Sequence, residues 1–174
     1  MTRSSVLLAI IALLGLGACS PTLDWREFTP EGSGIAVSFP CRPDRQTRAV
    51  TLAETRVTMA MLTCSAGDAT FALAYADLTD PARINVALTE LRAAAVGNLG
   101  GGVPERALLQ IKGMTSSDEA GRIVLAGRLP DGASVHEHAA LFTRGLRVYQ
   151  ATVIGADPPV PVVDAFMAGL KFPG

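Results

Sequence analysis

The spacing of apolar residues changes twice along this chain of 174 residues, and these changes constrain its fold more than any other feature. In the first half, apolar residues stand at every second position, as in Ile35, Val37 and Phe39, which is typical of β-strands with one buried face. Over Pro81–Leu99 they stand at every third or fourth position, which predicts an amphipathic helix that begins after Asp80. Beyond residue 104 the spacing of two returns.

The spacing of two indicates a series of strands with only two helices among them. Turn signals such as Pro130-Asp131-Gly132 separate neighbouring strands. Runs of strands with two helices predict an α+β domain, in which the helices pack on an antiparallel β-sheet. The chain is long enough for one such domain with its core. We expect strands at 25–28, 34–40, 47–52, 56–64, 70–78, 106–111, 117–129, 134–143 and 146–154, and a second helix at 162–171.

Residues 1–18 have the pattern of an export signal. Arg3 is the only charge before the apolar run Val6–Leu14, and small residues precede Cys19. The run is too short to span a bilayer, which takes roughly 20 apolar residues. The segment Leu16-Gly17-Ala18-Cys19 resembles the lipobox of bacterial lipoprotein signal peptides. This resemblance implies cleavage before Cys19 and acylation of that cysteine, so that the mature protein is anchored in lipid.

This interpretation divides the chain into three parts: a signal peptide at 1–18, an acylated N-terminus with a short tether at 19–24, and a single domain at 25–174. Ser20 follows the cysteine. In lipoproteins Asp at that position is the usual signal for retention at the inner membrane, so the resemblance implies an outer-membrane protein that faces the periplasm. A plain signal peptide or a signal anchor, with Cys19 incidental, is the alternative.

The charge balance argues against a nucleic-acid partner. Fifteen basic residues stand against 16 acidic ones, for a formal net charge of −1, so no broad positive field is available to phosphates. With 49 % hydrophobic and 18 % charged residues, the chain is also unlike a disordered protein. The partners we expect are the lipid bilayer, through Cys19, and an unknown protein.

Two cysteines remain once Cys19 is assigned to lipid. Cys41 and Cys64 are then an even number in a compartment that permits disulfides. A bond between them is favoured over two free thiols or a metal pair, because the sequence contains no C-x-x-C or other zinc spacing. The bond requires Cα atoms about 4.4–6.8 Å apart.

Two motifs resemble those of PsbP-like bacterial envelope proteins. One is Gly34-Ile35-Ala36-Val37-Ser38-Phe39-Pro40 with Pro43, and the other is the pair Arg147-x-Tyr149 followed by Phe172. Lys171 stands where serine often precedes that phenylalanine, which is a small departure. The resemblance implies an α/β/α sandwich around an antiparallel sheet. It also implies a non-enzymatic role in binding or assembly, although a fold alone does not determine function.

Few residues are candidates for metal binding or catalysis. His136 and His138 lie two apart on an expected strand, so both imidazoles face one side and could meet one metal ion, while Glu137 points to the other side. The sequence indicates no third ligand, and two polar residues on a solvated face are the alternative. It contains no G-x-S-x-G elbow and no phosphate-binding loop with its lysine. We therefore assign no catalytic residue and no cofactor.

Together these features favour a membrane-anchored envelope lipoprotein that is not an enzyme. It would bind a protein partner or serve as an assembly or accessory factor, and we expect an exposed apolar patch or groove on its domain. The alternative is a periplasmic protein that binds a small molecule, or a metal through His136 and His138. A hydrolase is a further alternative.

Overall fold

The structure is a computed structural model that describes residues 23–173. The expected signal peptide, Cys19 and Ser20 lie outside the described residues, and so does the final glycine. Within residues 23–173, no helix is long and apolar enough to cross a membrane. The described part is an α+β domain, which confirms the predicted fold class.

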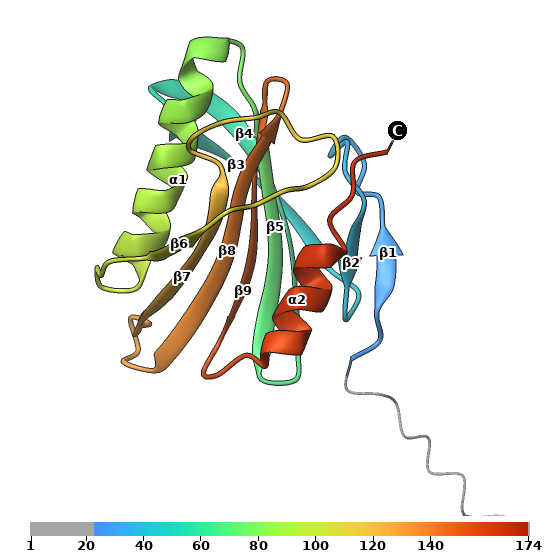
Figure 1. Cartoon of the computed structure of the whole chain (residues 1–174), viewed down its shortest axis with the longest axis vertical. Helices are drawn as coiled ribbons and strands as arrows, with labels where there is room; N and C mark the ends of the chain where they lie inside the picture. The colour runs from blue at the N-terminus through green and yellow to red at the C-terminus, as the bar shows by residue number, and fades with distance from the viewer. Residues whose placement is uncertain (1–22, 174) are drawn as a thin grey trace, which may run out of the picture.

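Seven strands form one antiparallel sheet in the order β3-β4-β5-β9-β8-β7-β6 (Figure 1). Neighbouring strands in the sheet pair antiparallel throughout, and four of these pairs are joined by short turns at Ala53-Glu54, Gly67-Asp68, Pro130-Asp131 and Gly145-Leu146. The strands are β3 (Asp44–Leu52), β4 (Thr55–Ala66), β5 (Ala69–Asp77), β6 (Glu105–Ala107), β7 (Gly121–Arg128), β8 (Ser134–Arg144) and β9 (Arg147–Gly155).

The two helices cover opposite faces of this sheet, so the domain has three layers (Figure 1). Helix α1 (Ile84–Asn98) follows a single 3-10 turn, η2 (Pro81–Arg83), and buries Leu88 and Leu91 against one face. Helix α2 (Val160–Ala168) buries Val163 and Phe166 against the other. Adjacent residues of one strand therefore enter different cores, because strand side chains alternate between faces. Leu141 packs on the α1 side and Phe142 on the α2 side.

A small second sheet completes the layer on the α2 side. Strands β1 (Arg26–Phe28) and β2 (Val37–Phe39) pair antiparallel and pack beside α2, separate from the main sheet. The last helix was expected to reach Lys171, but it ends at Ala168. A β-carbon on the next residue, Gly169, would lie 2.7 Å from that of Ser38, and Lys171 then pairs with Ala36 through two backbone hydrogen bonds of 2.8 and 2.9 Å.

The turn between β3 and β4 is formed by two residues that are unusual there. Ala53 and Glu54 have φ angles of 47° and 58°, in the left-handed region that costs an L-residue about 1–2 kcal/mol. Two side chains of the α1 layer hold the turn: the Glu90 carboxylate accepts from the Ala53 amide at 2.6 Å, and Arg83 donates to the Ala53 carbonyl. Because Ala53 is fully buried, the turn also closes one end of the α1-side core.

The sheet gives the domain two distinct ends. The tether end consists of Leu23, the β4–β5 and β7–β8 turns and the loop between β9 and α2, and the chain enters the domain there (Figure 1). The far end consists of the β3–β4 turn, the β8–β9 turn and the loop before β7. Nine-residue strands such as β9 join the two ends, so at roughly 3.3 Å per residue they lie about 30 Å apart.

Candidate functional site

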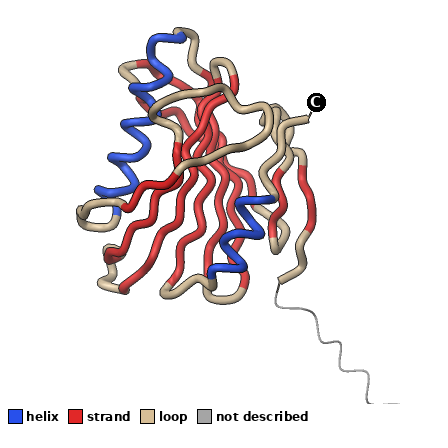
Figure 2. The backbone as a smooth tube through the Cα atoms, viewed as in Figure 1, coloured by secondary structure: helices blue, strands red, loops and turns tan. Residues whose placement is uncertain are grey.

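A long loop without regular structure crosses the far end between β6 and β7, over residues 108–120 (Figure 2). Strands were expected at 106–111 and 117–129, but only Glu105–Ala107 and Gly121–Arg128 pair. Ile111 turns inward and is buried in the α2-side core instead of extending a strand. Gly113, with a φ of 87°, reverses the chain just after it. The loop is therefore a structure of its own on top of the sheet.

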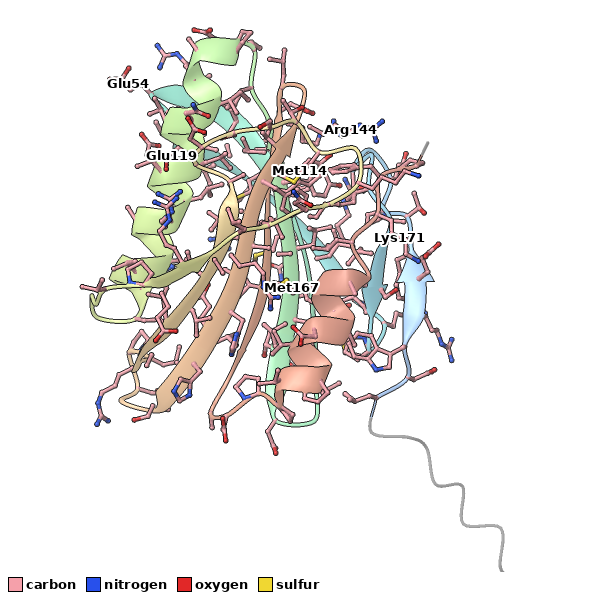
Figure 3. The ribbon with its side chains drawn as sticks, in the orientation of Figure 1. Glu54, Met114, Glu119, Arg144, Met167 and Lys171 are labelled. Carbon is pink, nitrogen blue, oxygen red and sulfur yellow. A yellow bond between two sulfur atoms is a disulfide. The ribbon has the colours of Figure 1, made fainter. Side chains whose placement is uncertain are left out.

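Both arms of this loop are held to the rest of the domain. Arg92 of α1 forms an ion pair of 2.8 Å with Glu119 and donates to the Glu119 carbonyl at 2.6 Å, and this guanidinium lowers the pKa of the Glu119 carboxyl. At the middle of the loop the Thr115 amide donates to the Thr143 carbonyl at 2.8 Å, and the Thr115 hydroxyl accepts from the Gly145 amide at 2.9 Å. Figure 3 shows Glu119 at the α1 side of the loop and Met114 over the sheet. The loop is thus fixed to the domain at its middle and at its second arm.

The two arms of the loop enclose an open hollow of about 750 Å³, which we call the loop hollow. Its lining combines apolar side chains with hydroxyls, an amide and charged groups. Leu108 is 95 % exposed although it lines the hollow. The lining residues with apolar side chains are Leu108, Leu109, Ile111, Met114 and Ala120, and the polar ones are Gln110, Lys112, Ser116, Ser117 and Asp118.

The motif Arg147-x-Tyr149 has a structural task at the same end of the domain. Arg147 makes two hydrogen bonds of 2.7 Å to the Asp77 carboxylate, which raise the pKa of the guanidinium. The Tyr149 hydroxyl donates to the Ser33 carbonyl at 2.7 Å, and burial raises the pKa of this phenol, so it stays a donor. The Tyr149 bond fastens the loop before β2 to the sheet, whereas the Arg147 bonds join β9 to β5. The cavity beside them, of about 460 Å³, is lined partly by these same paired groups.

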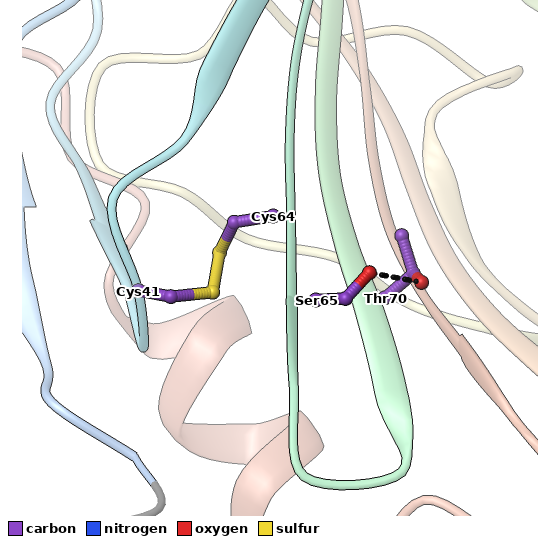
Figure 4. Close-up of a disulfide and its surroundings, with 4 residues drawn as sticks. All are labelled: Cys41, Cys64, Ser65 and Thr70. Carbon is purple, nitrogen blue, oxygen red and sulfur yellow. Dashed lines mark hydrogen bonds between the residues drawn. A yellow bond between two sulfur atoms is a disulfide. The ribbon is translucent and has the colours of Figure 1, made fainter. Parts of the chain in front are cut away.

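The predicted bond between Cys41 and Cys64 is present (Figure 4). Their Cα atoms are 6.0 Å apart, within the range of disulfides. Cys64 lies on β4 and Cys41 just after β2, so the bond ties the small sheet to the main one.

His136 and His138 lie on β8 and face the α2 side, as the strand spacing predicts. The Nδ1 atom of His136 is 3.0 Å from the Ala156 carbonyl. Burial, followed by the charge of Arg122, lowers the pKa of His138. Across residues 23–173, no group of three or more His, Cys, Asp or Glu side chains is placed to hold a metal ion. The structure thus supplies no third ligand for the predicted metal site.

Glu137, between the two histidines, is a feature that the sequence did not indicate as important. It does face the opposite side, as expected, but it is only 5 % exposed. Its neighbours across the sheet are Leu125 and Ile154, and Val135 and Ala139 flank it on its own strand. Burial raises the pKa of its carboxyl to about 7. The only signal in the sequence was one acidic residue in an otherwise apolar alternate row.

No protein-family model and no curated protein sequence matches this chain.

Proposed function

We propose that this protein is an exported lipoprotein of the bacterial envelope, anchored through acyl chains on Cys19 in the outer membrane and facing the periplasm. In this proposal it is not an enzyme, and its domain binds a protein partner. The observation that carries the binding role is the loop hollow at the far end, with the nearly fully exposed Leu108 at its wall.

Several features support binding at this place. Apolar side chains that are preorganised in a concave surface are typical anchors of protein interfaces, because their burial removes water without much cost in ordering. The loop is preorganised by Arg92 and Thr115. The loop hollow lies at the end of the domain away from Leu23, and its apolar lining residues support binding there. The Cys41–Cys64 bond supports export.

The test replaces Leu108 in the full-length protein with a photo-reactive amino acid and irradiates intact cells. The matched control is Val103, which is also 95 % exposed but does not line the hollow. We expect one discrete cross-linked protein from position 108 and none from position 103. The Leu108→Asp variant should lose this partner without a change in melting temperature, because the side chain is almost wholly in solvent.

Equal cross-linking from both positions, or an unchanged partner in the Leu108→Asp variant, would contradict a binding role for the loop hollow. A membrane fraction that lacks the protein would instead contradict the anchor. The two parts of the proposal are thus tested separately.

A further inference from the structure

The position at which the chain enters the domain limits how the domain can sit on a membrane. Leu23 lies against the β4–β5 turn and the loop before α2, where it lines a cavity of about 230 Å³ with Asp68, Asp157 and Pro159. Only three residues separate Cys19 from Leu23. Even when fully extended, the four Cα–Cα steps between them span about 14 Å.

This reach is short compared with the domain. The far end lies about 30 Å from the tether end, as the nine residues of β9 show. The polar headgroup layer of one leaflet is itself roughly 5–7 Å thick. An acyl anchor at Cys19 therefore holds Leu23 close to the headgroups.

The tether end also has an exposed apolar side chain of its own. Val160 begins α2 and is 65 % exposed, directly after Pro159 of the same loop. Asp68 and Asp157 of the same end are also exposed, and carboxylates are attracted to the ammonium groups of zwitterionic headgroups but repelled by the phosphates of anionic lipids. One exposed aliphatic side chain at an end that also has exposed carboxylates suits a surface that touches headgroups without entering the hydrocarbon.

We propose that the tether end is a membrane-contact surface that rests on zwitterionic headgroups, so that the strands stand away from the bilayer and present the loop hollow about 30 Å above it. This orientation rests on the proposed acyl anchor at Cys19. It places the hollow where a partner in the periplasm can reach it.

The test uses tryptophan fluorescence, because the chain contains a single tryptophan, Trp25. In a Trp25→Phe background, the Val160→Trp variant reports on the tether end and the Leu146→Trp variant on the far end. These are matched aliphatic positions that are 65 % and 41 % exposed. Each full-length lipidated protein is reconstituted in phosphatidylcholine–phosphatidylethanolamine vesicles that carry a nitroxide on the headgroup.

Flotation with the vesicles reports the anchor, and quenching reports the orientation. We expect both variants to float and the Val160→Trp fluorescence to be quenched several-fold more strongly than that of Leu146→Trp. Flotation with equal quenching, or with stronger quenching at position 146, would overturn the orientation while leaving the anchor intact. If neither variant floats, the anchor fails, and the orientation fails with it.

Discussion

The buried carboxyl of Glu137 gives a prediction with a defined sign. Its pKa is raised from 4.5 in the unfolded chain to about 7 in the folded domain. The folded state therefore holds this proton more tightly, and the contribution of Glu137 is most favourable below pH 4.5. As the pH rises from about 4.5 to 7, the folded state loses stability relative to the unfolded state. The shift of about 2.5 pH units lowers the free energy of unfolding at pH 8 by about 3 kcal/mol relative to its value below pH 4.5.

The Glu137→Gln variant removes this titration and keeps the shape of the side chain. The assay is urea denaturation of the wild type and the variant at pH 5 and at pH 8. A buried amide has a cost of its own, but that cost does not vary with pH. The informative quantity is therefore the difference between the two pH values. For each pH we take the free energy of unfolding of the variant minus that of the wild type. We expect this difference to be about 2 kcal/mol higher at pH 8 than at pH 5.

Glu105→Gln is the control, because Glu105 is an exposed carboxyl on β6 of the same sheet. It controls for the loss of one glutamate from the sheet without a change in the α1-side core. If the Glu137→Gln variant and the wild type differ by the same amount at both pH values, the carboxyl is not held in an apolar site, and our account of this side of the sheet is wrong.

Three further predictions concern stability and are measured by urea and thermal denaturation. Replacing Cys41 and Cys64 by serine should cost about 3 kcal/mol, because the bond closes a loop with a sequence separation of 23 residues; full stability without it would refute this. Glu54→Gly should raise the free energy of unfolding by roughly 1 kcal/mol, since glycine tolerates the φ of 58° and the ion pair that is lost is exposed; a destabilised variant would contradict strain in the turn. Tyr149→Phe should lower the free energy of unfolding by about 1–2 kcal/mol, because a buried hydroxyl no longer donates to the Ser33 carbonyl. An unchanged denaturation midpoint would show that this bond contributes nothing to stability.

The strands and helices were predictable where one face of each element is buried. The alternation of apolar residues predicted β4, β5, β8 and β9 to within a few residues of their observed bounds. A row of buried side chains along a strand specifies both the face that it buries and its register with its neighbours. The long helix was predictable for the same reason, but it begins at Ile84, because Pro81–Arg83 form a 3-10 turn in which Asp80 accepts from the Ala82 amide.

What the sequence did not predict depends on contacts between distant residues. The strand β3 begins at Asp44, earlier than expected, because pairing with β4 extends through its exposed, basic part. The turn at Ala53 and Glu54 contains no glycine, asparagine or proline that would predict it. Its conformation depends instead on Arg83 and Glu90 of the α1 layer, which bind the Ala53 backbone.

The disulfide and the loop hollow also differ in how far the sequence predicts them. The disulfide was predictable from the number of cysteines and the expected compartment. The loop hollow was not, because the apolar residues at 108–111 resemble a strand until Ile111 is seen to enter the core. The burial of Glu137 was also not predictable, because alternation along a strand indicates which face a side chain is on but not how exposed it is.

The central claim is that a disulfide-bonded domain is held at the membrane by acylated Cys19. Mass spectrometry of the N-terminal peptide of the mature protein, purified from membranes, tests it most directly. The account predicts a chain that begins at Cys19 and carries the mass of a diacylglyceryl group with a further acyl chain. A mature chain that begins elsewhere, or that retains Cys19 as an unmodified thiol, would contradict it.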